Sequence, residues 1–66
     1  MQITLNGKSR ALRNGSTIAD LVQALELVGK RLAVEVNEEV IPRSEHPKCV
    51  LNDGDRVEIV HAIGGG

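Results

Sequence analysis

The sequence predicts an α+β fold in which a mixed sheet of four to five strands is crossed by one helix. Three observations predict it. An alternating apolar and polar segment at residues 1–5 is followed by Asn6-Gly7, the pair that most readily forms a tight hairpin turn. A single amphipathic helical pattern follows at residues 18–25. Two later segments, residues 32–36 and 56–61, have the composition and alternation of strands.

The first hairpin pairs residues 1–5 with a return strand at residues 8–13. The pattern of the return strand is weak. Leu12 is expected to face the core, whereas Arg10 and Arg13 are expected to mark an exposed edge of the sheet.

The helix begins after the break at residues 14–16. Thr17 stands three residues before Asp20, which is the spacing of a capping box. Gly29 is expected to supply the left-handed residue that ends the helix. One stripe of the helix should lie on the sheet because apolar residues recur at i, i+3, i+4 and i+7; these are Ile18, Leu21, Val22 and Leu25.

The second half of the chain adds a strand, a short partner and a final strand. Residues 37–39 turn the strand at 32–36 into Val40-Ile41, and Pro42 stops this partner, which should therefore lie at an edge. Residues 43–48 are interpreted as a surface loop. Asn52-Asp53-Gly54-Asp55 is a strong turn signal.

The last strand, residues 56–61, is expected to run through the middle of the sheet. Val57 and Ile59 alternate onto one face, and Glu58 and Val60 fall on the other. A hairpin, one crossing helix and a central final strand are the elements of a β-grasp arrangement.

Composition excludes several classes of function. A chain of 66 residues makes one domain with a thin core, so an enzyme that encloses its substrate is not expected. There is no Phe, Tyr or Trp to stack on bases, and the formal charge of -1 gives no attraction to nucleic acid or anionic membranes. No leader or membrane-spanning stretch is recognised, and we expect the protein in the cytoplasm.

Few side chains suggest chemistry of their own. Cys49 is the only cysteine and lies in an apolar run, so we interpret it as a small core residue rather than a sulfur-carrying one. His46 and His61 lack the spacing of zinc ligands. Glu38 and Glu39 are adjacent in a turn and are not expected to act as a catalytic pair. We expect no metal site, no catalytic residue and no bound cofactor.

Three glycines, Gly64, Gly65 and Gly66, follow the last strand and end the sequence with a carboxylate. Consecutive glycines lose more conformational freedom on folding than other residues, so they contribute little to a fold. We expect residues 1–63 to form the domain and residues 64–66 a flexible tail. Extended, that tail is roughly 10 Å long. It is long enough to enter the active site of another protein.

The pattern of the whole chain resembles the ThiS family, the sulfur carrier proteins of thiamine biosynthesis, which have a ubiquitin-like β-grasp fold. The segments that carry the resemblance are the opening Met1-Gln2-Ile3, the helix entry Thr17-Ile18, the hairpin at residues 36–43 and the ending at residues 53–66.

The resemblance implies a reaction sequence at Gly66. An adenylyltransferase similar to ubiquitin-activating enzymes (ThiF type) would adenylate the terminal carboxylate, using its own ATP and magnesium. Sulfur, ultimately from a donor such as a cysteine desulfurase, would then form a thiocarboxylate on Gly66. Thiazole synthase (ThiG type) would accept that sulfur. The chain itself would be a protein cosubstrate and not an enzyme.

Two features of the chain are expected to be recognised by these partners. A side chain at Gly64 or Gly65 would widen the tail, so a narrow channel would exclude it. The body of the domain must supply the docking surface, with Ile41 as a possible extension across the sheet. The candidate residues near the tail are Arg56, Glu58, Val60, Ala62 and Ile63. An equally open reading is that Val60 and Ile63 are ordinary edge aliphatics.

Three other functions remain open. The small subunit of molybdopterin synthase is another β-grasp sulfur carrier that ends in Gly-Gly. A ubiquitin-like protein modifier would be joined to lysines of its targets through the terminal glycine. A plain interaction module would not use the tail at all.

Overall fold

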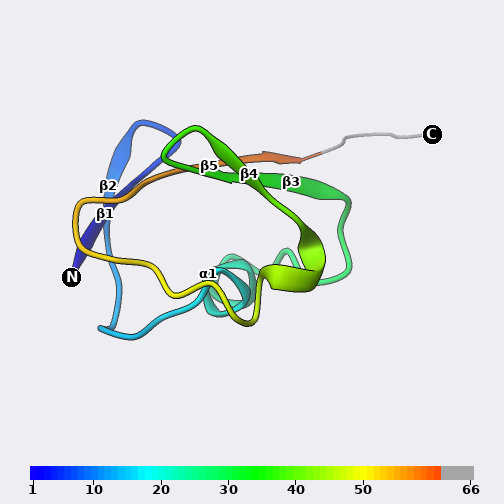
Figure 1. Ribbon diagram of the computed structural model, residues 1–66, viewed down its shortest axis with the longest axis horizontal. Coiled ribbons are helices and arrows are strands. Elements are labelled where there is room, and N and C mark those ends of the chain that lie inside the picture. Colours follow the sequence, from blue (N-terminus) through cyan, green and yellow to red (C-terminus); the bar gives the residue numbers. More distant parts are fainter. Residues whose placement is uncertain (62–66) are drawn as a thin grey trace.

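Figure 1 shows the computed structural model, which describes residues 1–61. One helix packs against one face of a five-stranded sheet. The elements are β1 (Gln2–Leu5), β2 (Lys8–Ala11), α1 (Ile18–Ala24), β3 (Leu32–Val36), β4 (Glu39–Ile41), the 3-10 turn η1 (Arg43–Glu45) and β5 (Arg56–His61).

The strand order β2-β1-β5-β3-β4 puts the last strand of the chain at the centre of the sheet. β5 runs parallel to β1 and antiparallel to β3, and the two hairpins β1–β2 and β3–β4 form the two halves of the sheet. The expected α+β fold, a mixed sheet of four to five strands crossed by one helix, is therefore confirmed with five strands.

Both hairpins use tight two-residue turns with positive φ angles. Asn6 and Gly7 have φ of 49° and 83°, and Asn37 and Glu38 have φ of 51° and 71°. Such turns match the twist of the flanking strands. The second turn is one residue shorter than expected, because Glu39 already pairs with Val36 in β4. β4 lies at an edge of the sheet, as the proline after it predicts.

α1 begins with the predicted capping box. The Thr17 hydroxyl accepts a hydrogen bond from the Asp20 N–H at 3.1 Å, and the Asp20 carboxylate accepts one from the Thr17 N–H at 2.9 Å. Two backbone donors at the start of the helix are thereby satisfied.

The expected end of α1 at Gly29 is wrong. Glu26, with φ of 59°, is the left-handed residue that terminates the helix. The Leu27 N–H donates to the Val22 carbonyl at 3.0 Å, which closes the wider loop of a Schellman motif and brings Leu27 back onto the core. Packing of Leu27 explains why a non-glycine residue takes this conformation, and Gly29 serves the next turn instead.

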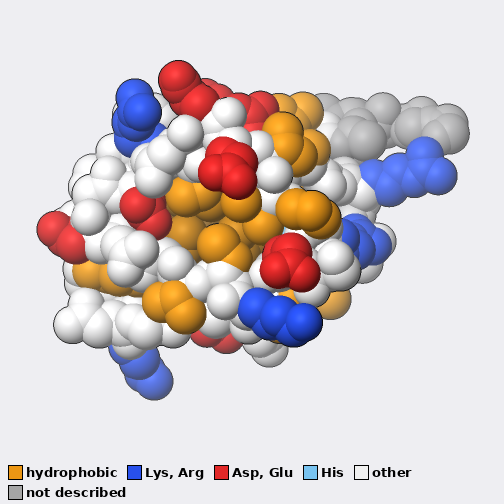
Figure 2. Space-filling view, viewed as in Figure 1, with side chains coloured by type: hydrophobic (Ala, Val, Ile, Leu, Met, Phe, Trp, Pro, Cys, Tyr) orange, Lys and Arg blue, Asp and Glu red, His pale blue; other side chains and the backbone are white. Residues whose placement is uncertain are grey.

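The core lies between α1 and the sheet and is built from aliphatic side chains alone. Figure 2 shows hydrophobic side chains still visible in the middle of one face, between charged side chains. A domain of this size covers its core only partly. The buried hydrophobic residues are Ile3, Ile18, Leu21, Val22, Val34, Leu51, Val57 and Ile59.

β2 is shorter than predicted and ends at Ala11. Leu12 packs against the core, as expected, and Arg13 is exposed. Arg10 differs from the expectation of an exposed edge residue, because it pairs with buried Ile3 and is itself half-buried. Its backbone position turns its side chain to the face that carries the helix.

The segment 43–48 is more ordered than a surface loop. It contains η1, and His46 directly after it is only 6% exposed. The His46 ring nitrogen Nε2 lies 3.1 Å from the Ile41 carbonyl oxygen, to which it donates a hydrogen bond. The Ala19 N–H in turn donates to the His46 carbonyl at 3.1 Å, so this segment is fastened to both β4 and α1.

The predicted turn before β5 is present. Gly54 has φ of 87°, and the Asn52 N–H donates to the Asp55 carboxylate at 2.8 Å. The Gln2 N–H donates to the Asp53 carboxylate at 2.7 Å, and the Gly54 N–H donates to the Gln2 carbonyl at 2.7 Å. The turn thus holds the start of β5 beside the start of β1.

Candidate functional site

β5 is the structural base of the candidate site, because it is held from both sides. On one side it pairs with β3 from Leu32↔His61 to Val36↔Val57. On the other side it pairs with β1 at Thr4↔Arg56 and Leu5↔Val57. A strand in the centre of a sheet is among the last elements to open. At the end of β5, Val60 and His61 pair with β3 alone.

The two faces of β5 differ as the sequence predicts. Val57 and Ile59 are buried against the helix, whereas Arg56, Glu58 and Val60 are exposed. These three predicted surface residues therefore share the face of the sheet that the helix does not cover, here called the open face. The remaining predicted site residues, Ala62, Ile63, Gly64, Gly65 and Gly66, lie outside the described residues.

Ile41 does not extend the surface as expected. It pairs with buried Val34 and packs against the core, on the helix side of the sheet. Its neighbour Val40 takes the open face instead and is 64% exposed. The register of β4, which begins at Glu39, decides which of the two residues points outward.

Register also brings residues to the open face that the sequence reasoning missed. Ala33 lies directly opposite Val60, and Glu35 lies directly opposite Glu58. The alternation of residues 32–36 was a signal that positions 33 and 35 share a face, but it carried no information on their partners in β5. The open face along β5 therefore combines exposed aliphatic side chains with two glutamates at opposed positions.

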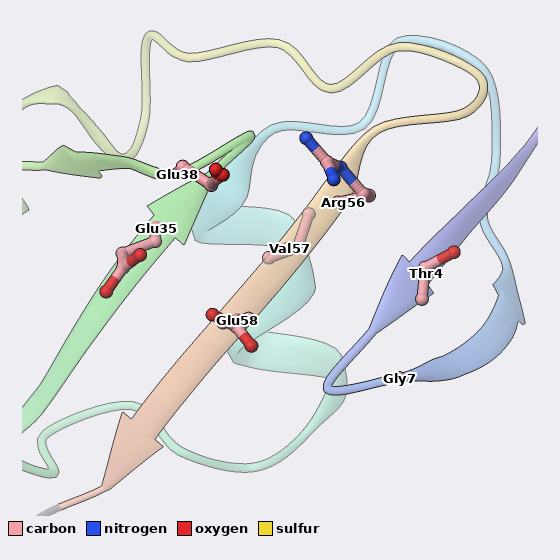
Figure 3. Close-up of a pocket in the computed structure, with 7 residues that line it drawn as sticks. All are labelled: Thr4, Gly7, Glu35, Glu38, Arg56, Val57 and Glu58. Atoms are coloured by element: carbon pink, nitrogen blue, oxygen red, sulfur yellow. The ribbon is translucent and has the colours of Figure 1, made fainter.

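A shallow hollow of about 340 Å³ lies on this face. Figure 3 views it with α1 behind β5, and shows Glu35 and Glu58 on neighbouring strands, with Arg56 at the same end of the hollow as Glu38. Its lining residues are Thr4, Gly7, Glu35, Glu38, Arg56, Val57 and Glu58. Within residues 1–61, no group of three or more His, Cys, Asp or Glu side chains is arranged to hold a metal ion.

Cys49 is half-buried and packs against the core, as its apolar neighbours predict. Burial raises the pKa of its thiol, and the negative charges of Asp55, Glu39 and Glu45 raise it further. A raised pKa disfavours the thiolate that nucleophilic chemistry needs. His61 is exposed at the end of β5.

In the part of the chain that the structure covers, no helix combines the length and hydropathy that a membrane crossing requires.

Comparison with known proteins identifies the family. The model of the ThiS family matches residues 3–66. This chain belongs to the ThiS family. The match includes the last strand and the glycines after it, so the resemblance seen in the sequence is confirmed.

The ThiS family also includes solved structures with this fold. The crystal structure of the thiamine biosynthesis protein ThiS from Geobacter metallireducens superposes with a TM-score of 0.84 at 32% identity, and the match covers 100% of both chains. The β-grasp arrangement inferred from the order of elements is thus the fold of a ThiS protein.

The similar proteins fall into two groups by length. The sulfur carrier protein ThiS of Bacillus subtilis is 38% identical over 97% of this chain and 98% of its own length. Two relatives named thiazole synthase, from Paramagnetospirillum magneticum and Magnetococcus marinus, are also 38% identical, but the chain spans only 20% of their length. In those longer proteins a ThiS-like segment is part of a larger polypeptide.

Proposed function

We propose that this chain carries sulfur for formation of the thiazole ring as a thiocarboxylate on Gly66. The observation that supports the proposal most is the ThiS family match through residue 66. Relatives of nearly the same length in Bacillus subtilis, Escherichia coli and Thermus thermophilus are named sulfur carrier proteins. A role as sulfur carrier in thiamine biosynthesis follows from that membership, and the steps below are the proposed chemistry.

The first step is activation of the Gly66 carboxylate. A carboxylate resists nucleophiles because of its charge, and oxide is a poor leaving group. An activating enzyme would bind ATP and magnesium and let a Gly66 carboxylate oxygen attack the α-phosphorus. Pyrophosphate leaves, and Gly66 becomes an acyl adenylate. The carrier contributes the carboxylate and a narrow approach to it, since glycine adds no side chain at Gly64 or Gly65.

The second step exchanges AMP for sulfur. A sulfur nucleophile attacks the acyl carbon of Gly66, and AMP leaves with the bonding electrons. If the nucleophile is a persulfide, for example one formed by a cysteine desulfurase, the product is an acyl disulfide. A thiol then cleaves its S–S bond and releases the thiocarboxylate. Cys49 is not proposed as this thiol, because its half-buried position and raised pKa disfavour attack.

The third step delivers sulfur to the acceptor enzyme. The names of the two longer relatives support thiazole synthase as that enzyme. Bonding of the Gly66 sulfur to the thiazole precursor gives a thioester. Water then attacks the Gly66 acyl carbon, the C–S bond breaks and the sulfur stays on the precursor. The Gly66 carboxylate is thereby restored, and the carrier can accept sulfur again. In this scheme the chain is a substrate of other enzymes and needs no catalytic residue of its own.

The fold suits such a carrier because the reacting group follows a strand in the interior of the sheet. β5 has partners on both sides, and its last residue, His61, pairs with Leu32. The five residues that follow in the sequence would span roughly 17 Å if extended. A rigid domain can thus be bound by one surface while the carboxylate reaches a separate catalytic centre.

Reconstitution tests the proposal against its nearest alternatives. The chain that carries a thiocarboxylate on Gly66 is supplied separately to thiazole synthase and to the large subunit of molybdopterin synthase. Sulfur transfer to each is measured. We expect transfer to the thiazole precursor alone. Transfer to molybdopterin would favour the alternative sulfur carrier, and isopeptide conjugates detected in cell extracts would favour a protein modifier. A control preparation without the thiocarboxylate should transfer no sulfur to either enzyme.

A further inference from the structure

Two glutamates occupy directly opposed positions on the open face of the sheet. Glu35 in β3 and Glu58 in β5 form a directly opposed cross-strand pair. Side chains in such pairs lie close together, and like charges in this position destabilise a sheet. An oppositely charged or apolar residue at either position would avoid this repulsion.

The rest of the hollow does not neutralise the pair. Arg56 is the cation of the lining and lies two residues before Glu58 on the same strand. Figure 3 shows its guanidinium turned toward the end of the hollow where Glu38 lies, away from Glu58. Three carboxylates and one guanidinium therefore line a space of about 340 Å³. The space is large enough to admit a long basic side chain.

Exposed aliphatic residues border the acidic pair. Val40 lies directly opposite Glu35, and Val60 lies two residues beyond Glu58. Both valines are well exposed, at 64% and 65%, and Ala33 lies opposite Val60. Aliphatic contact area next to a charged group is a common composition of protein interfaces. The surface formed by Ala33, Glu35, Val40, Glu58 and Val60 is called the acidic face below.

We infer that the acidic face docks on the sulfur-accepting enzyme, which places a lysine or arginine side chain over the Glu35–Glu58 pair. The inference rests on the proposed function, because it takes the acceptor to be the thiazole synthase. A cation between the two carboxylates removes their repulsion, so binding gains both the new attraction and the relief of the old repulsion. Val40 and Val60 pack against aliphatic side chains around that cation.

Four observations favour this partner over others. A second copy of the chain, docked face to face, would bring the same carboxylates together and is disfavoured. Nucleic acid would be repelled for the same reason. A thiazole synthase is favoured because two relatives of that name carry a segment like this chain in one polypeptide. The acidic face also adjoins the end of β5, from which Gly66 must reach the acceptor.

The test measures binding of the full chain, with a free carboxylate and no sulfur on Gly66, to a purified thiazole synthase. This thiazole synthase has no carrier segment of its own. The variant carries Glu35→Gln and Glu58→Gln, and the dissociation constant is measured at low and high salt. We expect the variant to bind about tenfold more weakly at low salt, and its affinity to depend less on salt. The control Glu26→Gln removes an exposed carboxylate beyond α1 and should bind like the parent chain.

Unfolding of the variant is not a confounding explanation, because loss of the like-charge pair should keep or raise its melting temperature. Weaker binding with unchanged or higher stability therefore supports the inference. Three results would overturn it: no binding of the parent chain, equal binding and salt dependence in parent and double variant, or an equal loss in Glu26→Gln. Thiocarboxylate formation is measured separately, so its failure would reject the proposed chemistry and not this docking surface.

Discussion

The side-chain amide of Asn6 pairs with the backbone of Ile59 as a neighbouring strand would. Its Oδ1 accepts a hydrogen bond from the Ile59 N–H at 2.8 Å, and its Nδ2 donates to the Ile59 carbonyl at 3.2 Å. The backbone ladder between β1 and β5 pairs only Thr4 with Arg56 and Leu5 with Val57. One turn residue thus continues the support of β5 toward its far end.

Loss of this amide should weaken the domain. We expect Asn6→Gly to lower the free energy of unfolding by about 2 kcal/mol, because two hydrogen bonds to a buried residue are lost while the positive φ remains favourable. Asn6→Ala should cost about 1 kcal/mol more because of the left-handed backbone. Urea unfolding measures both values. Equal stability of Asn6→Gly and the parent chain would show that the amide does not support β5.

The capping box at Thr17 gives a second stability prediction. Thr17→Ala removes the hydroxyl that accepts the Asp20 N–H, and should lower the free energy of unfolding by about 1 kcal/mol. The matched control is Ser9→Ala, which removes an exposed strand hydroxyl bonded to the Gln2 side chain. That control should change stability by less than about 0.5 kcal/mol. Thermal unfolding of Thr17→Ala and Ser9→Ala measures both stabilities. An equal loss of stability in the two variants would contradict a specific capping effect.

Cys49 gives a prediction in alkaline solution. Burial and nearby carboxylates raise the pKa of its thiol in the folded chain, so the neutral thiol is favoured by folding. The resulting stability is fully present below the pKa of the unfolded chain and is lost as pH rises through the folded pKa. Between neutral and alkaline pH, the parent chain should therefore lose more stability than Cys49→Ala.

Alkylation provides an independent measurement of the same thiol. Because the pKa of the Cys49 thiol is raised, the rate of reaction with iodoacetamide should rise with a higher midpoint pH than that of a free thiol. The urea-unfolded chain should show a lower midpoint. A folded midpoint below the unfolded one would mean that the thiolate is stabilised, and Cys49 would then be a candidate for sulfur chemistry.

The tail glycines give a prediction that separates folding from activation. Gly65→Val should leave the melting temperature unchanged, because the strands and the core described within residues 1–61 do not need residue 65. Adenylation by the cognate activating enzyme should fall by about 100-fold, since the side chain displaces the carboxylate from its productive position. Ser9→Ala, an exposed substitution in β2 outside the candidate docking surface, is the control. Normal adenylation of Gly65→Val would refute a narrow channel for the tail.

Local patterns in the sequence predicted most of the fold. The turn at Asn6-Gly7, the capping box at Thr17 and the strand at residues 32–36 depend on neighbouring residues, and the structure has all three. The helix end was missed because Leu27 packs on the core and lets Glu26 adopt the left-handed conformation. The helix therefore ends at Glu26 and not at Gly29 because of tertiary packing, which local sequence patterns do not predict.

The acidic face could not be predicted from local patterns, because it depends on how strands far apart in the sequence pair with each other. Glu35 and Glu58 are far apart in the sequence, and only the pairing of β3 with β5 places them opposite each other. The register of β4 against β3 explains why Val40, and not Ile41, faces outward. Burial of His46 likewise follows from contacts with β4 and α1 that a polar, irregular segment did not suggest.

Intact-mass spectrometry of the full chain tests the central claim most directly. The chain is incubated with its activating enzyme, ATP, magnesium and a sulfur donor, and the product is fragmented to locate any change. The account predicts a mass gain that corresponds to one oxygen replaced by sulfur, confined to Gly66 and absent without ATP. No gain, or a gain located on Cys49, would contradict it.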